Sequence, residues 1–209
     1  MKEKNPSYIS DARRTQIINA AITTLGEIGY VRASLAQIAQ RAGISTALIS
    51  YHFRDKPDLM DHTLAILLRD NALFVSERTK AGKNCRERLH LFIRSGLEYQ
   101  ERHPEHFIAL LEIVFNARTS EDIPYYRISD ADGEDTLLTE LRNILYEGQK
   151  TGEFRNFNVR VMADTIQGAI GEFASPNTAG KPDAATYGGE LTKIFDRAVV
   201  HDRKNAENT

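Results

Sequence analysis

Apolar residues recur along most of the chain at three- and four-residue intervals, the spacing that places them on one face of an α-helix. This pattern predicts a first helix over residues 10–29 and two short helices over 34–42 and 45–52. Further helices are expected from Asp55 onward and near 84–102, 104–117, 134–151, 158–174 and 184–200. Since no segment alternates convincingly between apolar and polar residues, the predicted fold class is all-α, with about nine helices.

The segment 34–56 is the most informative part of the chain, because it reads as a short helix, a glycine turn and a second short helix. Ser34 and Gln37 form the S-x-x-Q pattern in which a side chain and the backbone satisfy each other's unpaired groups at a helix start. Gly43 stands where a helix end often needs a left-handed residue. Asp55 and Asp58 repeat the start signal for the long helix that follows.

The second short helix has separate inner and outer faces. Ser45 can cap it, and Ile49 and Phe53 lie one turn apart, so both should point inward. Its outer face is small at the N-terminal end and hydroxyl-rich beyond, which suits a helix presented to the major groove of DNA. The outer residues are Thr46, Ala47, Leu48, Ser50, Tyr51 and His52.

The charge distribution fits a polyanion at one end of the chain. The 209 residues are 41% hydrophobic and 27% charged, which is ordinary for a globular protein. Residues 1–56 carry eight Lys and Arg against four acids, a charge of +4. Since the net charge of the chain is −2, the remaining residues carry −6. Ordinary charge scatter is the alternative, and Arg13 and Arg14 are interpreted as a solvated face.

Several classes of protein are not favoured. Cys85 is the only cysteine, so no internal disulfide and no thiolate zinc cluster can form, and a reducing cytoplasm is expected. No run approaches the roughly 18 apolar residues of a membrane span, and the N-terminus lacks the apolar region of a signal peptide. The enzyme motifs G-x-x-x-x-G-K-[ST], G-x-S-x-G and H-E-x-x-H are absent. His103 and His106 give a weak metal spacing without a third ligand, so no metal and no cofactor are expected.

Two motifs resemble the TetR/AcrR family of transcriptional regulators. They are A-x-I-A-x-x-A-G-I-S, from Ala36 to Ser45, and the Y-H-F-x-x-K ending, from Tyr51 to Lys56, within roughly the first quarter of the chain. The G-x-x-x-G-E-F segment of residues 148–154 and the helical plan add to the resemblance. Residues 1–56 are most similar to the choline-responsive repressors of the family. The body shows no such likeness, and without tryptophan a quaternary-ammonium cage is not favoured.

The resemblance implies a homodimeric repressor that binds a palindromic operator in double-stranded DNA and is released by a small-molecule inducer. It implies a DNA-binding domain over 1–56 with its motif at 34–53, a ligand-binding and dimerisation domain over 57–201, and a frayed tail over 202–209. Thr46, Ala47 and Leu48 would face base edges. Phosphates would be contacted by Ser34, Ser45, Tyr51, His52 and Lys56. Ser50 departs from the family pattern, because many members have a tyrosine there.

The C-terminal part offers two further sets of candidates, each with plain core packing as its alternative. Aromatic and polar residues of the middle helices suit a pocket for a small, mostly apolar ligand: Phe92, Tyr99, His103, Phe107, Leu111, Phe115, Tyr126 and Gln167. Small and apolar residues of the last two helices suit an intersubunit four-helix bundle: Ile166, Gly168, Ile170, Gly171, Phe173, Leu191, Ile194 and Phe195.

Two alternatives from other functional classes remain open at this point. One is a DNA-bound architectural or regulatory protein without a small ligand, which a body with no cavity would favour. The other is an all-α enzyme, which loss of activity with a chelator would favour. The balance of motifs and charge predicts a DNA-binding regulator that acts in the cytoplasm without a membrane partner.

Overall fold

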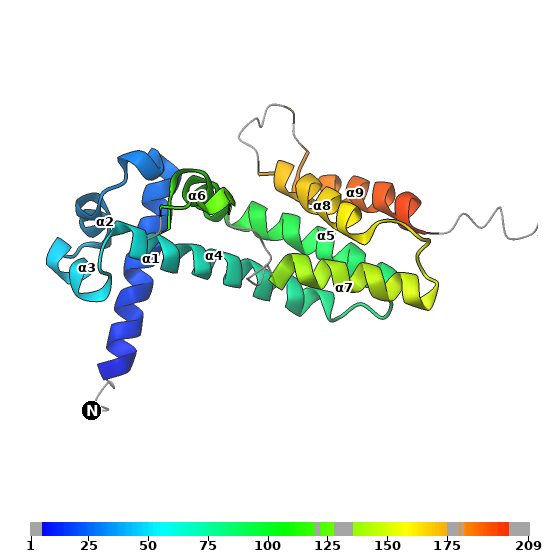
Figure 1. Ribbon diagram of the computed structural model, residues 1–209, viewed down its shortest axis with the longest axis horizontal. Helices are drawn as coiled ribbons and strands as arrows, with labels where there is room; N and C mark the ends of the chain where they lie inside the picture. The colour runs from blue at the N-terminus through cyan, green and yellow to red at the C-terminus, as the bar shows by residue number, and fades with distance from the viewer. Residues whose placement is uncertain (1–5, 120–121, 128–135, 175–179, 181, 201–209) are drawn as a thin grey trace, which may run out of the picture. The chain divides into compact units, whose positions relative to one another are not determined.

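The computed structural model describes residues 6–119, 122–127, 136–174, 180 and 182–200. Within this part the chain is all-helical, with one short 3-10 turn, η1 (Tyr125–Arg127), and two isolated β-bridges. Its α-helices, in chain order (Figure 1), are α1 (Pro6–Arg32), α2 (Leu35–Ala42), α3 (Thr46–His52), α4 (Lys56–Thr79), α5 (Cys85–Arg102), α6 (Pro104–Asn116), α7 (Thr136–Thr151), α8 (Val159–Glu172) and α9 (Ala184–Val199).

The predicted all-α class is confirmed, and most helix starts agree with their sequence signals. Asn84, Asn158 and Asp183 cap α5, α8 and α9, each accepting a hydrogen bond from the backbone N–H three residues on. The first helix is longer than predicted, because α1 continues to Arg32 across a break at Gly29, where φ is +75°. The predicted tail, 202–209, lies outside the described residues.

The chain divides into two compact units. The first unit comprises Met1–Leu68 and Pro104–Ala131, and the second comprises Arg69–His103 and Asp132–Thr209. Helix α4 contributes its first half to one unit and its second half to the other. The predicted boundary between a DNA-binding domain and a ligand-binding domain, after residue 56, differs from the first division between the units, after Leu68. The predicted functional boundary stays a prediction.

The first unit contains α1, α2, α3, the start of α4, and α6, with α1 packed on both α2 and α6. Among the side chains whose burial is described, its core is aliphatic around one buried ring, Phe53, which is 1% exposed. The inner face of α2 is formed by Ile38, Ala39 and Ala42, which are buried. α6 therefore supports α1 from a position about eighty residues further along the chain.

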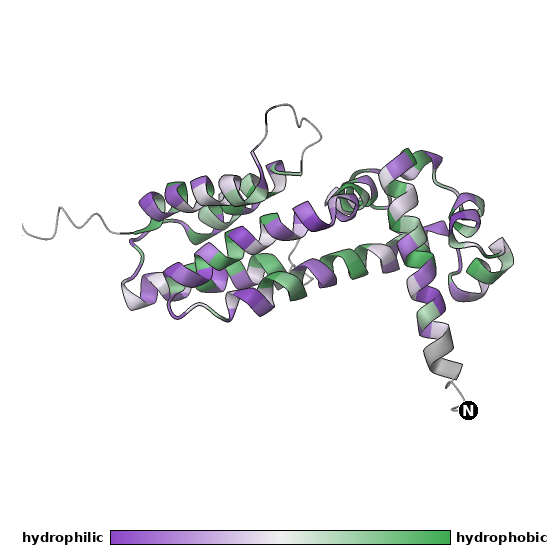
Figure 2. Cartoon of the chain, turned by 180° about the vertical axis from the view of Figure 1, so that it is seen from behind, coloured by the Kyte–Doolittle hydropathy of each residue, from purple (hydrophilic) through white to green (hydrophobic). Residues whose placement is uncertain are grey.

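The second unit is a helical bundle in which α5, α7, α8 and α9 run beside one another (Figure 1). Its helices are amphipathic, with apolar and polar residues on different faces (Figure 2). The turn between α7 and α8 explains the glycine that opens G-x-x-x-G-E-F, because a Cβ on Gly148 would overlap the buried ring of Phe154. No helix among the described residues combines the length and apolarity that crossing a membrane requires.

Candidate DNA-binding site

Helices α2 and α3 form a tightly capped pair. The Ser34 Oγ accepts the N–H of Gln37 at 3.3 Å, and the Gln37 Oε1 accepts the N–H of Ser34 at 2.9 Å. Gly43 ends α2 with a left-handed φ of +66°, and its N–H bonds the carbonyls of Ala39 and Gln40. These local bonds confirm the predicted helix, turn and helix, and they fix the direction in which α3 leaves the turn.

Helix α3 presents its outer face to solvent while its inner face is pinned. The Ser45 Oγ accepts the N–H of Leu48 at 3.2 Å, and Ile49 is fully buried. Tyr51 is 81% exposed, the clearest outward side chain of the helix. Of the other residues predicted on the outer face, Thr46, Ala47 and Ser50 are exposed, and Leu48 and His52 are half-buried. The geometry suits a helix offered to a groove, and the individual DNA contacts remain predictions.

Arg14 of α1 supports the end of α3, a role that the sequence interpretation missed. Its Nη1 donates to the carbonyl of His52 at 2.7 Å, and its guanidinium lies 4.5 Å from the centre of the Phe53 ring. The interpretation of Arg14 as part of a solvated face is therefore incomplete. The sequence spacing could have indicated this position, because Arg14 lies three residues before Ile17, on the face of α1 that is buried.

The same contacts affect the chemistry of His52. Burial lowers the pKa of its ring below the usual value, and the positive charges of Arg14 and Arg13 lower it further. Near neutral pH His52 is therefore the neutral imidazole, which can donate or accept a hydrogen bond but brings no positive charge. It also meets the ring of Tyr51 edge-on, with centroids 5.1 Å apart.

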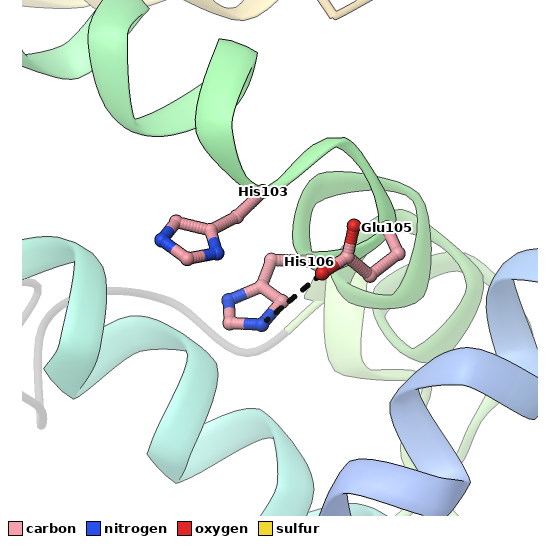
Figure 3. Close-up of side chains that lie close together, drawn as sticks. All are labelled: His103, Glu105 and His106. Atoms are coloured by element: carbon pink, nitrogen blue, oxygen red, sulfur yellow. Dashed lines mark ion pairs between the residues drawn. The ribbon is translucent and has the colours of Figure 1, made fainter.

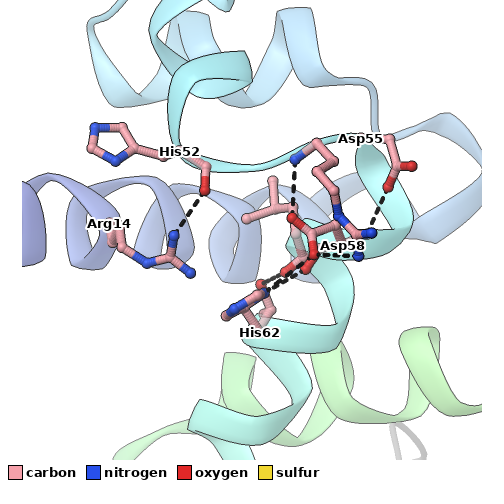
Figure 4. A network of polar contacts seen from close by, with 8 residues as sticks. Arg14, His52, Asp55, Asp58 and His62 are labelled. Carbon is pink, nitrogen blue, oxygen red and sulfur yellow. Dashed lines mark hydrogen bonds and ion pairs between the residues drawn. The ribbon is translucent and has the colours of Figure 1, made fainter.

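The loop from α3 to α4 is closed by carboxylates, as Figure 4 shows. The Asp55 Oδ1 accepts the N–H of Asp58 at 2.8 Å, which confirms the predicted cap. The Asp58 carboxylate in turn accepts the N–H of Arg54 at 2.9 Å and its guanidinium at 3.1 Å. The hydrogen bond from the Arg54 backbone is the largest cause that holds the pKa of Asp58 below its usual value, so this brace requires the ionised form.

Lys56 has a partner inside the protein. Its Nζ donates to the carbonyl of Tyr30 at 2.6 Å and lies 3.9 Å from the centre of the Tyr30 ring. Burial lowers the pKa of this ammonium group. The predicted contact between Lys56 and a phosphate would therefore have to compete with an existing internal bond.

The backbone N–H of Tyr30 is bonded as well as its carbonyl. Its N–H donates to the Glu112 Oε2 of α6 at 2.7 Å, directly after the break at Gly29. Asn116 donates to the same oxygen at 3.3 Å. One residue at the end of α1 is therefore bonded both to α6 and to the start of α4, and nothing local in the sequence indicated this junction.

The predicted ligand residues are divided between the two units, four in each. In the first unit Phe107 and Leu111 are half-buried, while Phe115 and Tyr126 are 62% and 52% exposed and stack at 6.3 Å. In the second unit Phe92 and Tyr99 are 1% and 6% exposed, and the His103 ring lies 4.9 Å from that of Tyr99. Gln167 has a buried amide oxygen without a hydrogen-bond partner among the described residues.

The predicted dimer residues also separate into two groups. Ile166, Ile170, Leu191 and Phe195 are at most 9% exposed within the single subunit, because they face its own core. A side chain already covered in this way can add little area to an interface, and the role of these four residues in a dimer stays a prediction. Gly171 and Phe173 are half-buried, and Phe173 packs on Tyr187 at 5.4 Å. Ile194 is 56% exposed, and Gly168 is exposed with open space beside it.

The histidines of the weak metal spacing lie where α5 ends and α6 begins (Figure 3). His103 is the C-terminal cap of α5, and its backbone N–H bonds the carbonyl of Tyr99. In α6, His106 Nε2 lies 3.8 Å from the Glu105 carboxylate. His103 therefore has an ordinary role at a helix end, whereas Glu105 is a third possible ligand group that the sequence interpretation did not identify.

A capped α2–turn–α3 pair with an exposed second helix defines a helix-turn-helix DNA-binding domain. Residues 17–63 match the family model described as bacterial regulatory proteins, tetR family. A curated relative, the HTH-type transcriptional regulator BetI of Paraburkholderia phytofirmans, is 35% identical over 92 residues, which are 44% of this chain and 47% of the relative. The N-terminal part of the chain is therefore a TetR-type DNA-binding domain, and the curated relative that it resembles is a transcriptional regulator.

Solved structures extend the likeness to most of the chain. The ketosteroid transcriptional regulator KstR2 of Mycobacterium tuberculosis covers 91% of this chain and 96% of its own at a TM-score of 0.70, with 19% identity. FadR of Bacillus subtilis, solved in complex with stearoyl-CoA, covers 87% and 96% at a TM-score of 0.74, with 22% identity. These identities establish a shared fold alone. The chain matches only about half the length of the curated relative.

Proposed function

We propose that this protein is a homodimeric repressor that binds a palindromic operator and is released from it by a small, mostly apolar ligand. The observation that carries the proposal is the geometry of α3, a short helix with a buried inner face and an outer face led by the 81% exposed Tyr51. Two such helices in a dimer would enter successive major grooves about 34–36 Å apart.

The contacts divide into two kinds. Thr46, Ala47 and Leu48 open α3 and would meet base edges, where Ala47 and Leu48 suit thymine methyl groups. Tyr51, Ser34 and Ser45 would bond phosphate oxygens, the two serines at helix starts whose backbone amides favour anions. His52 would add a bond without a charge, because its pKa is lowered.

Ligand release follows from linkage. A ligand that binds one arrangement of the subunits better than another shifts the population toward it, and the operator must weaken ligand binding by the same factor. FadR of Bacillus subtilis, which shares the fold, was solved with stearoyl-CoA, and this supports a ligand for the body. Dimerisation through α8 and α9 is proposed for exposed positions such as Ile194, Gly168 and the 60% exposed Val161.

Selection of bound duplexes from a random DNA pool at two salt concentrations tests the proposal. We expect a palindromic consensus, and an affinity that falls steeply with salt because phosphate contacts release counterions. Thr46→Ala should change which sequences are selected, whereas Tyr51→Phe should weaken all sequences alike. Absence of binding to any duplex at low salt would refute a DNA-binding regulator.

A further inference from the structure

Both helices of the helix-turn-helix end at a carbonyl that a side chain of α1 caps. The last residue of α2 is Ala42, and the last residue of α3 is His52. The last carbonyls of a helix have no partner within that helix and need one from elsewhere. The Gln16 Nε2 donates to the Ala42 carbonyl at 2.6 Å. The Arg14 Nη1 donates to the His52 carbonyl at 2.7 Å (Figure 4). Two side chains of one helix therefore hold the ends of both α2 and α3.

The amide of Gln16 is itself oriented by a neighbour. The Arg13 Nη1 donates to the Gln16 Oε1 at 2.5 Å. Since a guanidinium group can only donate hydrogen bonds, the amide oxygen has to face Arg13. The NH2 group of the same amide is then directed to the Ala42 carbonyl. The interpretation of Arg13 as part of a solvated face is therefore incomplete, as it is for Arg14.

Arg14 makes a second contact that fixes its side chain. Its guanidinium lies 4.5 Å from the centre of the Phe53 ring, which is 1% exposed. Its charge lies at the C-terminal end of α3, where the helix dipole favours a cation. Arg13 and Arg14 both lie one turn before the fully buried Ile17, at the start of the buried face of α1. We call Arg13, Arg14 and Gln16 the α1 clamp.

The shortness of α3 makes the position of its ends important. Its seven residues span about 10 Å, so a tilt of about 10° at one end moves the other end by about 1.7 Å. Groups that recognise a partner have to be held within about 0.5 Å of their productive positions. A small movement at either end of α3 would therefore spoil the fit of its outer face to a groove.

The two bonds of the clamp act on opposite ends of α3. Three residues, 43–45, separate Ala42 from the start of α3. The bond from Gln16 to Ala42 therefore fixes the point from which the chain enters α3, where Thr46 lies. The bond from Arg14 fixes the other end, at His52. The first end carries the residues proposed to meet base edges, and the second carries those proposed to bond phosphates.

From this geometry we propose that Gln16, oriented by Arg13, and Arg14 are positioning residues for operator recognition. Gln16 sets how well α3 discriminates between sequences, and Arg14 sets the strength of the phosphate contacts at the end of α3. Both act through α3 rather than by touching DNA. The inference rests on the proposed function, since it concerns how the same helix-turn-helix distinguishes its operator from other duplexes.

The test compares two duplexes, the consensus operator selected from the random pool and a scrambled duplex of the same length and composition. The ratio of the two affinities measures discrimination, and it is measured at a temperature where every variant is folded. Gln16→Leu leaves the net charge unchanged and should lower this ratio about tenfold, the size of one mismatched base pair. Its affinity for the scrambled duplex and its salt dependence should equal those of the unmodified protein, because the phosphate contacts are kept.

Asn19→Leu is the matched control, because Asn19 is an exposed amide residue of α1 one turn after Gln16, and the ratio should stay unchanged. If Gln16→Leu does not fold, Gln16→Glu replaces it. Glutamate can still accept from Arg13 but, when ionised, cannot donate to the Ala42 carbonyl. An unchanged ratio in a folded Gln16 variant would overturn the inference, since a merely structural residue alters the melting temperature without altering discrimination.

Arg14 is tested by the salt dependence of binding. Arg14→Met should weaken the binding of both duplexes about tenfold, the size of one lost hydrogen bond to a phosphate, and should leave their ratio unchanged. Arg14→Lys should recover most of this loss, because lysine keeps a donor and the charge. If Arg14→Met makes the slope of log affinity against log salt shallower by about 1, Arg14 contacts a phosphate directly and its positioning role is wrong. Failure of the proposed function is a separate outcome, because the unmodified protein would then bind neither duplex at low salt.

Discussion

The two units differ in how completely their buried polar side chains are paired among the described residues. In the first unit polar groups bond from one helix to the backbone at the end of another, as Arg14 does to His52, Gln16 to Ala42 and Lys56 to Tyr30. In the second unit the buried hydroxyls bond within their own helices, and four buried atoms have no partner among the described residues. The second unit also bonds side chains to helix ends, since Glu101 accepts the N–H of Ala184 and Arg155 donates to the carbonyl of Ala198. The difference between the units is therefore in the pairing of their buried polar atoms.

The largest expected effects come from removing one buried ring from each unit. Phe53→Ala and Phe154→Ala should each lower the free energy of unfolding by about 3–5 kcal/mol, since both rings are at most 2% exposed. Phe53→Ala should also abolish operator binding, because Phe53 ends α3 and lies under Arg14. Thermal unfolding and duplex titration measure the two properties.

Comparing the operator affinity of the two variants tests whether the two units have different roles. At a temperature where both variants are folded, Phe154→Ala should keep most of its operator affinity, because its ring packs in the turn after α7. Equal loss of DNA binding in both variants would show that the units do not divide their roles as described.

A smaller effect is expected at the junction of α1 and α6. Glu112→Ala removes the acceptor of the Tyr30 N–H, which is then left unpaired, and should cost about 1–3 kcal/mol of stability. Operator affinity should fall as well, because the α1 segment that holds Lys56 loses its anchor. Asn116→Ala is the control, since it keeps the bond from Tyr30 to Glu112. Denaturant unfolding and duplex titration of both variants test the difference, and equal stabilities would contradict this role of Glu112.

The second unit offers a matching test by pH. Burial raises the pKa of Asp196, but hydrogen bonds from Arg86 and His90, at 2.7 and 2.6 Å, outweigh it and hold the pKa below its usual value. Because the folded pKa is lowered, this stabilisation is complete above the unfolded pKa of about 4 and is lost as pH falls through the folded value. Asp196→Asn should cost about 1 kcal/mol at pH 7 and progressively less toward pH 3 in thermal unfolding. A constant difference between the variants across this range would exclude ionisation as the cause.

The features predicted correctly from the sequence are local ones. The Ser34–Gln37 cap, the Gly43 turn and the Asp55–Asp58 cap each depend on residues within four positions of one another, so composition and spacing determine them. The inward direction of Ile49 also follows from helical periodicity alone. These features suffice to define the helix-turn-helix and its exposed face.

The features that the sequence did not indicate join distant positions. Glu112 bonds Tyr30 across 82 residues, and Arg14 bonds His52 across 38. Such partners depend on how the helices pack, which no short motif encodes. The burial of Ile166, Ile170, Leu191 and Phe195 within the single subunit was not indicated for a related reason, since an apolar stripe alone does not reveal which neighbouring helix covers it.

The smallest effect decides between two roles of Lys56, for which sequence and structure point in different directions. The motif predicts a phosphate contact, whereas the ammonium is already bonded to the carbonyl of Tyr30 and lies over its ring. We expect Lys56→Met to change the free energy of unfolding by about 1 kcal/mol and to weaken operator binding at every salt concentration. The slope of log affinity against log salt should stay unchanged, because no counterion is released at a lysine that does not reach DNA. Lys80→Met, at an exposed lysine of the second unit, controls for the change in net charge.

A slope shallower by about 1 would instead mean that Lys56 leaves Tyr30 to neutralise a phosphate. In that case the internal bond would be a resting position of the free protein, and Tyr30 would lose one of its two anchors whenever DNA is bound.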